Sequence, residues 1–522
     1  MSKKYIKDAE LHSKLSKGIE DLSEYVSATL GPGGRNVLLK SKDRPPVITK
    51  DGVTISKFMS VPGHFTSVGA ELIKEVASLT NDSVGDGTTT SIVLAAALYK
   101  ESQKFLTAGI RPIDLKRGMD LACEQIVETI REGSRPITSK DDVEHVAAIS
   151  ANGDKSIGRL IAEAIDKIGK DGAISIEDSR TAKTYLDIVE GFSFGAGYAS
   201  ESFITDERKK AIKFEDCLLF VTDRKLDLEE MLPLLEIVAR DGKPFVIVAE
   251  DFEKKILSAL ILNAIRGTMK VVAIKAPKYG QERRQLLSDL ALSVGAKFVT
   301  REGGALISDI KLSDLGNAKT IEISKNKTTI AGGDCKYDLV EERIELLREE
   351  IRTEDDINIC ERIQERISSL LSGVAVIKVG AHSQIEMIEK KHRIEDALEA
   401  VHAAQTDGIH GGGGIPLYRA AADLSPPEDI SDNEMFGFNV VKKAAAAPIC
   451  KIAENADMSA DLVKQKIVDI DDNLGYDFST GEVVDLLESG IVDPVSVTCT
   501  ALRNAVSVVS TLISTNHAIV ED

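Results

Sequence analysis

The residues best suited to chemistry form one run in which flexible glycines precede hydroxyl side chains, Gly85-Asp86-Gly87-Thr88-Thr89-Thr90-Ser91. The apolar segment 92–99 follows and predicts that this run opens a helix. The free N–H groups and the positive dipole end of such a helix attract phosphate. Asp86 adds a carboxylate that can hold Mg²⁺ against phosphate oxygens. Taken alone, the run also fits an ordinary helix capped by threonine, which is the more common case.

Two other glycine-rich segments are compatible with the same chemistry. Thr29-Leu30-Gly31-Pro32-Gly33-Gly34 lies between a predicted helix and a predicted strand, and Gly411-Gly412-Gly413-Gly414 follows the helix that contains Asp396. Glycine lets a backbone approach a nucleotide closely, although both segments can equally be plain turns. No Gly-x-x-x-x-Gly-Lys-Ser/Thr motif occurs, which excludes a P-loop enzyme. Only a fold that joins the two ends of the chain can bring these segments together.

Helical patterns dominate both ends of the chain. Apolar residues recur with helical spacing over 9–30, and long helical patterns fill 65–132 apart from the polar stretch 81–87. Short strand-like runs separate these segments, at 36–39, 47–49 and 53–55. The chain therefore begins with helices that surround a small β region.

Between about 190 and 374 the pattern changes to alternating strands and helices. The apolar strands are expected at 217–222, 244–249, 270–274 and 296–300. Helical patterns between them are typical of a sheet covered on both faces. Further on we expect a charged helical pair at 337–371, a strand at 374–379 and a helix at 384–405 before a mostly helical remainder. The fold class is therefore mostly α, with an α/β insertion between helical ends.

Composition and charge exclude several classes of protein. The 522 residues include 84 acidic and 65 basic ones, so a net charge of −19 argues against a uniformly basic nucleic-acid binder. A hydrophobic fraction of 43% excludes wholesale disorder. No run of about 18 consecutive apolar residues predicts a membrane span. Six cysteines without Cys-x-x-Cys spacing and a polar start favour reduced thiols and a cytoplasmic location, and the eight histidines offer no better metal site.

Several motifs occur together and in one order along nearly the whole chain. They are Thr29-Leu30-Gly31-Pro32, Thr49-Lys50-Asp51-Gly52-Val53, Asn81-Asp82 with the glycine–threonine run, Leu115-Lys116-Arg117-Gly118, Ile149-Ser150-Ala151-Asn152, Met231-Leu232-Pro233, Val374-Ala375-Val376-Ile377-Lys378-Val379-Gly380 and Glu395-Asp396-Ala397-Leu398. In these motifs the chain resembles the group I chaperonins of the GroEL and Hsp60 type, as a divergent member.

The resemblance implies a three-domain subunit. An equatorial ATP-binding domain would comprise 2–132 and 407–522, an intermediate hinge domain 133–189 and 375–406, and an apical α/β client-binding domain 190–374. The family implies seven-membered rings, unfolded polypeptide clients and a co-chaperonin lid of the GroES type, with no nucleic acid or membrane partner. This nesting would explain how distant glycine segments meet.

The resemblance also implies roles at an ATP site. Asp86 would coordinate Mg²⁺, Lys50 would neutralise phosphate charge, Asp51 would orient the metal and the attacking water, and Asp396 would activate that water after domain closure. K⁺ is a further possible ion. Without the resemblance, Asp396 fits a plain surface carboxylate. The implied nucleotide-binding positions are Thr29, Leu30, Gly31, Pro32, Lys50, Asp51, Asp86, Gly87, Thr88, Thr89, Thr90, Ile149, Ser150, Gly412, Gly413, Asp477, Phe478, Ser479, Ile491 and Asp493.

An apolar groove for clients is implied in the apical domain. Its positions here are Tyr198, Phe203, Leu232, Leu235, Leu257, Ile261 and Leu262. Without the resemblance, a helical stripe such as the last three is more often buried core. Ser202 stands where the family often has Tyr, which makes the surface more polar.

Other positions depart from the family pattern. Asp477-Phe478-Ser479 replaces the usual Asn-Ala-Ala near adenine, and an aspartate cannot donate a hydrogen bond as asparagine does. Two charged pairs expected between subunits and between rings correspond to Ala196 with Gln384 and Cys450 with Ser459, and the expected glycine–methionine tail is absent.

Three functions are compatible with these observations. The first is an ATP-driven folding chamber, favoured by Asp51, Asp86 and Asp396. The second is a passive or specialised client-binding ring with little ATP turnover, for which the departures leave room. The third, a small-molecule phosphotransferase, lacks a recognisable acceptor pocket. The sequence therefore predicts an ATPase coupled to protein folding.

Overall fold

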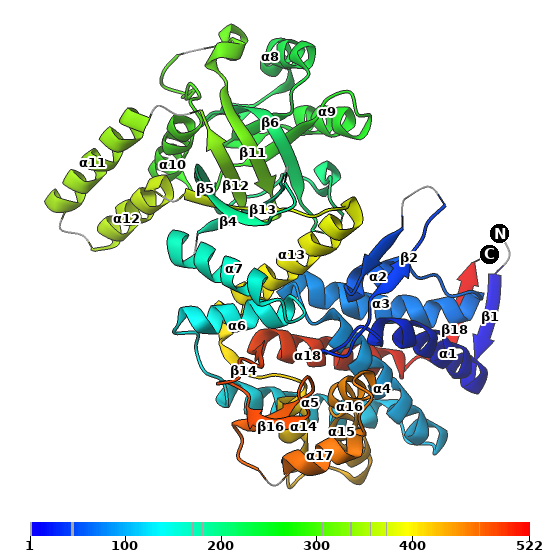
Figure 1. Cartoon of the computed structure of the whole chain (residues 1–522). Coiled ribbons are helices and arrows are strands. Elements are labelled where there is room, and N and C mark those ends of the chain that lie inside the picture. Colours follow the sequence, from blue (N-terminus) through cyan, green and yellow to red (C-terminus); the bar gives the residue numbers. More distant parts are fainter. Residues whose placement is uncertain are drawn as a thin grey trace. The chain divides into compact units, whose positions relative to one another are not determined.

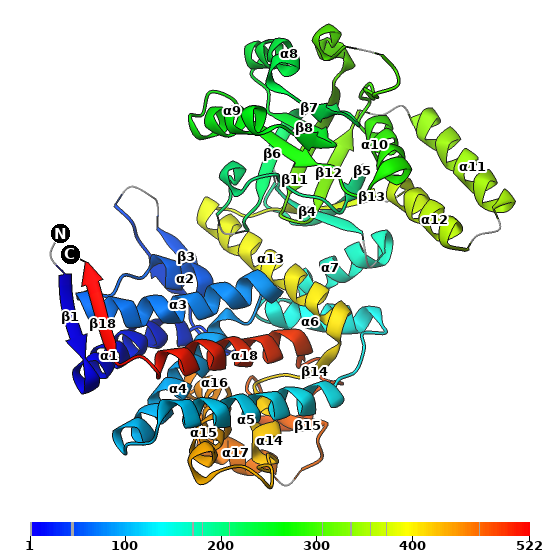
Figure 2. The same cartoon turned by 180° about the vertical axis from the view of Figure 1, so that it is seen from behind.

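The computed structural model describes residues 3–42, 46–169, 172–179, 181–207, 209–304, 306–334, 337–354, 357–371, 373–468 and 470–521. They form two compact units, shown in Figures 1 and 2. The first unit is Met1–Glu163 with Gly380–Asp522, and the second is Ala164–Val379. The segments predicted as a hinge domain fall partly in each unit, and the three-domain boundaries stay a prediction.

The first unit is a bundle of helices, as the sequence predicts. Long helices α1, α3, α4, α5 and α18 pack around a core of leucine, isoleucine, valine and alanine. Its helices are α1 (Asp8–Ser27), α2 (Gly52–Phe58), α3 (His64–Val84), α4 (Thr88–Thr107), α5 (Pro112–Glu132), α6 (Lys140–Ser150), α13 (Gln384–Asp407), α14 (Ile415–Ala422), α15 (Asp432–Ala444), α16 (Ala447–Asn455), α17 (Ala460–Val468) and α18 (Val495–Leu512); α7 (Lys155–Ile168) leads into the second unit.

Small antiparallel sheets join the two ends of the chain within this unit. Strand β1 (Lys3–Lys7) pairs with β18 (His517–Glu521), so both described termini lie side by side in Figures 1 and 2. Strand β2 (Val37–Leu39) pairs antiparallel with β3 (Val47–Thr49), β15 (Leu474–Asp477) with β16 (Glu482–Asp485), and β14 (Ile409–Gly411) with β17 (Val492–Pro494). Residues far apart in sequence are thereby adjacent.

Helix α18 is the most apolar long helix of the described chain. By length and composition alone it is the only described helix that passes as a membrane span. Its contacts with α3, α4, α5 and α13 account for that composition, since 61% of the helix is buried inside the unit. The apolar character of α18 therefore reflects core packing.

The strand predicted at 53–55 is wrong, because these residues lie in α2. The Asp51 carboxylate accepts hydrogen bonds from the N–H groups of Val53 and Thr54 at 3.1 and 3.0 Å. Such an N-cap satisfies the free donors at a helix start, which outweighs the β preference of a short valine–threonine–isoleucine run. The capping aspartate follows strand β3 by two residues, so strand and helix meet there.

The second unit is built around one eight-stranded sheet. Its order is β10-β8-β6-β11-β12-β5-β13-β4, in which β10, β8 and β6 are parallel, the strands from β6 to β13 alternate in direction, and β13 is parallel to β4. The strands are β4 (Ala173–Asp178), β5 (Tyr185–Phe194), β6 (Ile212–Val221), β8 (Phe245–Ala249), β10 (Val271–Lys275), β11 (Gly316–Ile323), β12 (Thr328–Gly333) and β13 (Gly373–Val379); the short β7 (Lys225–Leu226) and β9 (Asp251–Phe252) pair separately.

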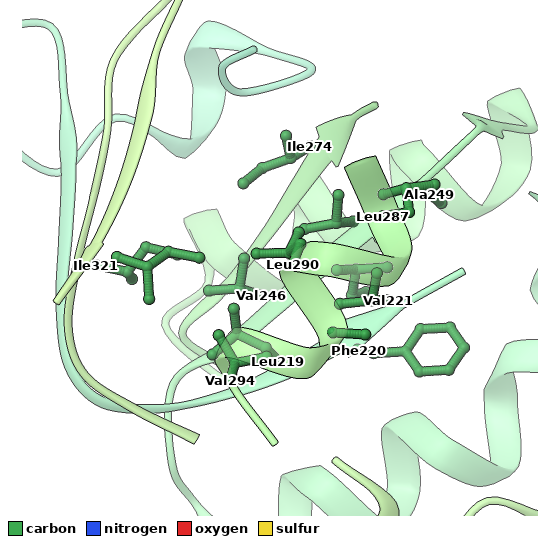
Figure 3. Close-up of a cluster of buried hydrophobic side chains, with 14 of the residues drawn as sticks. Leu219, Phe220, Val221, Val246, Ala249, Ile274, Leu287, Leu290, Val294 and Ile321 are labelled. Carbon is green, nitrogen blue, oxygen red and sulfur yellow. The ribbon is translucent and has the colours of Figure 1, made fainter. Parts of the chain in front are cut away.

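Five α-helices of the described chain lie wholly in the second unit. They are α8 (Leu228–Asp241), α9 (Lys254–Ile265), α10 (Gly280–Ser293), α11 (Tyr337–Thr353) and α12 (Ile357–Leu371), with short 3₁₀ turns at Glu201–Phe203, Ile307–Asp309 and Leu312–Asp314. Helices α8, α9 and α10 lie beside the parallel strands, whereas α12 contacts β5 and α11 packs on α12. Figure 3 shows Leu287 and Leu290 of α10, and Val294 directly after it, packed over Val246 and Leu219 of the sheet. The strand predicted at 296–300 is wrong, since only Val299 forms a bridge, to Thr222.

Candidate functional site

A cavity of about 550 Å³ in the first unit collects the motifs that the sequence singles out. Its wall combines the loop after α1, the start of α2, the turn between α3 and α4, the end of α6, one face of α13, and the segments around residues 413, 477 and 493. Both ends of the chain therefore contribute to this space, named here the first-unit cavity.

The start of α4 forms one wall of the first-unit cavity. Gly85 and Gly87 adopt φ values of 70° and 77°, which only glycine adopts easily, and Thr88 begins the helix without a side-chain cap. A side chain at Gly87 would also collide with Val497, whose Cγ1 lies 2.5 Å from an ideal Cβ. The first-turn N–H groups thus lack a capping side chain and are suited to an anion.

A second helix start meets the first. Gly52 opens α2, and an ideal Cβ at this position would lie 2.6 Å from the Thr89 hydroxyl. A Cβ at this position would therefore collide with the hydroxyl groups of the first turn of α4. The positive ends of two helix dipoles therefore converge beside the Asp51 and Asp86 carboxylates.

Two carboxylates in the first-unit cavity have raised pKa values. The pKa of Asp86 is raised mainly by desolvation and also by the charge of Asp51, although the Ser150 hydroxyl donates to it at 2.9 Å. Desolvation, with the charge of Asp86, raises the pKa of Asp493 to about 7. A cation held here would relieve this repulsion, so the residues fit a bound Mg²⁺.

The donor set also suits that ion. In the described chain, no group of three or more His, Cys, Asp or Glu side chains is arranged as a complete metal site. Magnesium is commonly held by one or two carboxylates together with substrate phosphates, so a site without a full protein cage is consistent with it.

Helix α13 supplies Asp396 and three residues that the sequence did not single out. Glu389, His392 and Arg393 also line the first-unit cavity. The Arg393 guanidinium pairs with Glu389 at 2.8 Å and with Asp154 at 3.1 Å, which fixes this face of the helix. His392 precedes Asp396 by four residues and Glu389 precedes it by seven, which places them on one face of the helix. This helical spacing is a signal that could have identified Glu389 and His392.

Lys50 contributes a cation that interacts with charged residues of α13. Desolvation is the main cause that lowers the pKa of Lys50, the Glu389 carboxylate raises it, and the Arg393 guanidinium lowers it further. The lysine lines the same cavity as the two helix starts. Its position suits the neutralisation of an anionic ligand.

The other end of the first-unit cavity is apolar. The rings of Tyr476 and Phe478 are 5.3 Å apart in an edge-to-face arrangement, and Leu30 and Ile491 pack against the same cluster. Asp477 turns its carboxylate back into its own hairpin, where it accepts from the Ser479 N–H at 2.7 Å and the Thr480 hydroxyl at 2.9 Å. This end can hold a flat apolar group.

His410 is a further lining residue that the sequence analysis missed. Its Nε2 lies 3.0 Å from the Thr498 hydroxyl, and its Nδ1 faces the carbonyl of Gly411. Desolvation lowers the pKa of His410 to about 4, so the ring is neutral near pH 7. Its position directly before the glycine run was the available signal.

Almost all predicted nucleotide positions line the first-unit cavity. The exception is Gly412, whose ideal Cβ would lie 3.3 Å from the Asp493 carboxylate just behind the wall. The cavity therefore brings together the predicted motif segments, which contain Thr29, Asp86, Ser150 and Asp396.

A model of the TCP-1/cpn60 chaperonin family matches residues 22–522. The chain belongs to this family. Among solved structures, the chaperonin gp146 from the bacteriophage EL 2 (Pseudomonas aeruginosa), in the presence of ATP-BeFx, matches with a TM-score of 0.68 and 21% identity. The match covers 99% of this chain and 99% of that chain, so the chaperonin fold extends along the whole sequence.

The positions predicted for client binding in this chaperonin divide into three groups by exposure. Leu232 of α8 and Leu262 of α9 are each 47% exposed. In contrast, Tyr198, Phe203 and Leu235 are less than 10% exposed and belong to the core of the second unit. Leu257 and Ile261 are partly buried against that core. The exposed part of the predicted groove is therefore smaller than the seven positions suggest.

Proposed function

We propose that this chaperonin binds ATP with Mg²⁺ in the first-unit cavity, hydrolyses it, and uses the reaction to promote the folding of bound polypeptides. The observation that carries the proposal is the convergence of phosphate-binding motifs from both ends of the chain on one cavity. The ATP analogue present with the phage chaperonin, which shares the fold, supports the same assignment.

The phosphate end of the first-unit cavity has the parts that the reaction needs. The uncapped first turn of α4 and the Lys50 ammonium would bind the phosphates. Asp86 would hold Mg²⁺, which when bound neutralises charge on the phosphate oxygens. K⁺ remains a further possible ion. Asp51, fixed by its hydrogen bonds to the start of α2, would orient the attacking water.

Asp396 is the proposed general base. It lies on the same face of α13 as His392 and lines the same cavity as the phosphate motifs. Acceptance of a proton from water by a carboxylate contributes a factor of about 10²–10⁴ to the rate in comparable cases. The apolar end, with Phe478 and Ile491, would hold the base.

We further propose that the exposed leucines of α8 and α9 bind unfolded clients. Leu232 and Leu262 offer apolar surface on neighbouring helices, and single exposed leucines on adjacent elements can form a shared contact surface. Seven-membered rings, a GroES-type lid and a cytoplasmic location belong to the same proposal. Five described cysteines are free thiols, which suits a reducing compartment.

The rate of ATP hydrolysis by the purified protein tests this function. We expect turnover that requires Mg²⁺ and changes when a denatured client or a co-chaperonin is added. Capture of the denatured client without nucleotide turnover would instead support a passive client-binding ring. Failure of ATP to bind would contradict the assignment of the first-unit cavity.

A further inference from the structure

A second cavity, of about 640 Å³, lies entirely within the second unit. It is named here the second-unit cavity. Asp223 follows the end of β6 by two residues, Glu250 follows β8 directly, and Gly280 is the first residue of α10. All three line the cavity, which therefore opens at the carboxyl ends of the parallel strands. It is separate from the first-unit cavity and shares no residue with it.

The strand connections reverse direction at this point. From β6 the chain moves through α8 to β8 and through α9 to β10, always away from β6 on one side. It then returns through α10, and Val299 pairs with Thr222 on the other side of β6. Figures 1 and 2 show α8 and α9 on one side of these strands and α10 on the other. In open α/β sheets, ligands bind outside the carboxyl ends of strands at such a reversal.

Four arginines line the second-unit cavity, and carboxylates hold them in place. Arg283 lies 2.6 Å from Glu250, whose other oxygen is 3.5 Å from Arg301. Arg284 lies 3.0 Å from Asp223. The Asp223 side chain is only 7% exposed and also accepts the backbone N–H of Arg301 at 2.7 Å. The guanidinium groups are thus positioned before any ligand arrives.

The fourth arginine is held by a carboxylate that already has a partner. Arg343 lies 3.1 Å from Asp289, and Arg366 makes two hydrogen bonds to the same carboxylate at 2.7 and 3.0 Å. Asp289 is 2% exposed and carries one negative charge, which Arg366 and Arg343 share. Arg343 therefore adds positive charge to the cavity wall.

The charges around the second-unit cavity leave a positive surplus. Five guanidinium groups, including Arg366, face the three carboxylates Asp223, Glu250 and Asp289. After each carboxylate is matched with its nearest guanidinium, Arg301 and Arg343 remain, with side chains 68% and 31% exposed. Glu302, the second partner of Arg284, is 76% exposed, and solvent screens it and the similarly exposed Arg301 alike, so counting Glu302 leaves one surplus positive charge. This surplus occurs in a chain whose overall charge is −19.

We propose that the second-unit cavity binds a small molecule that carries a phosphate group. The positive surplus suits an anion, and arginine favours phosphate because its N–H groups form paired hydrogen bonds with phosphate oxygens. Gly280 and Gln281 at the start of α10, a helix without a side-chain cap, add backbone N–H groups on the same wall. The volume is within the range of small-molecule sites.

This site is distinct from the proposed client surface. The exposed leucines lie on α8 and α9, whereas the second-unit cavity is lined by the start of α10, the ends of β6 and β8, and Arg343 of α11. A ligand at this point contacts α10 and α11 and leaves Leu232 and Leu262 uncovered. The inference therefore stands independently of ATP hydrolysis and client capture.

Calorimetric titration of the full-length protein with pyrophosphate tests the proposal, with excess ADP present to fill the first-unit cavity. We expect saturable binding of one pyrophosphate per subunit, and we expect Arg301→Gln with Arg343→Gln to weaken it at least about tenfold, because two charge-assisted contacts are lost. Hydrogen exchange should locate the site by slower exchange of the backbone amides of residues 280–284 in the presence of pyrophosphate.

The matched control is Arg240→Gln with Arg266→Gln, which removes two exposed arginines at the ends of α8 and α9. This control is expected to bind pyrophosphate as the unmodified protein does. Equal affinity in the Arg301/Arg343 variant and the unmodified protein, or no saturable binding by the unmodified protein, would overturn the proposal. Equal loss in both double variants would also overturn it, because it would indicate nonspecific attraction to positive charge.

Discussion

The first-unit cavity and the apolar surface of α8 and α9 differ in how their predicted residues are used. In the cavity, polar and glycine residues from distant segments face one space, and all but Gly412 of the predicted nucleotide positions reach it. On α8 and its surroundings, Leu232 is 47% exposed while Leu235, three residues further, is 8% exposed. Neighbouring positions on one helix thus have opposite environments.

The difference follows from the chemistry of the side chains. A buried carboxylate or a glycine with positive φ is costly unless something nearby requires it, so such residues indicate a site. An apolar side chain is stable both in a core and in a client contact, so its type alone does not distinguish the two. Predictions about the cavity are therefore sharper than predictions about the apolar surface.

The largest expected effect concerns Asp396. We predict that Asp396→Ala lowers the rate of ATP hydrolysis by at least about 100-fold while ATP affinity changes little, because a general base acts on the water and not on the bound nucleotide. Phosphate release and calorimetry measure the two quantities. The control is Glu395→Ala, next to Asp396 but outside the cavity wall. Equal loss of binding and hydrolysis would show that Asp396 serves to bind ATP.

Two alanine substitutions on α8, one at a buried and one at an exposed leucine, test the apolar surface of α8 and α9. We predict that Leu235→Ala lowers the free energy of unfolding of the second unit by about 2–4 kcal/mol, because it leaves a cavity in the core. Leu232→Ala should change it by no more than about 0.5 kcal/mol but reduce capture of a denatured client. Urea unfolding and a client aggregation assay measure these effects. Comparable destabilisation by both substitutions would remove the contrast between core and surface.

The pH dependence of protein stability tests the burial of His410 in the wall of the first-unit cavity. His410 has a pKa near 4 in the fold and about 6.5 when unfolded, so its neutral form stabilises the fold fully above pH 6.5 and less as the pH falls. We predict that the stability of the protein relative to His410→Gln decreases by about 3 kcal/mol from pH 6.5 to pH 4. The comparison between the two proteins is needed because Asp493, with its raised pKa, has the opposite pH trend. Parallel stability curves would contradict burial of a neutral ring.

The smallest expected effect is at Asp477. Its carboxylate is engaged by Ser479 and Thr480 within its own turn. We therefore expect Asp477→Asn to change ATP affinity by less than about threefold, which corresponds to well under 1 kcal/mol. Calorimetric titration of ATP into the unmodified protein and into the Asp477→Asn variant measures this change in affinity. A tenfold gain in ATP affinity would mean that the family's asparagine contact with adenine can be restored here.

Much of the fold follows from the sequence because long helices have strong periodicity. The patterns over 9–30 and 384–405 match α1 and α13 closely. The failures occur where one local contact outweighs propensity, as when the Asp51 cap turns a short β-like run into α2. At residues 296–300, only Val299 finds a strand partner, because β11 occupies the neighbouring edge of β6.

Prediction of the site was limited in a different way. The phosphate motifs could be recognised, but His392 and Arg393 carry no motif of their own and enter the cavity only because α13 presents that face. Burial of Tyr198 and Phe203 depends on how the loop before β6 folds onto the sheet, which residue types do not specify. Long-range packing therefore decides what local patterns leave open.

The central claim is that both ends of the chain form one ATP site. Hydrogen exchange measured with increasing ATP-BeFx and Mg²⁺ tests it most directly. The account predicts that the backbone amides of residues 30–34 and 86–91 and those of residues 411–414 and 477–479 become protected together, with one midpoint concentration. Protection of only one end of the chain, or two clearly different midpoints, would contradict the claim.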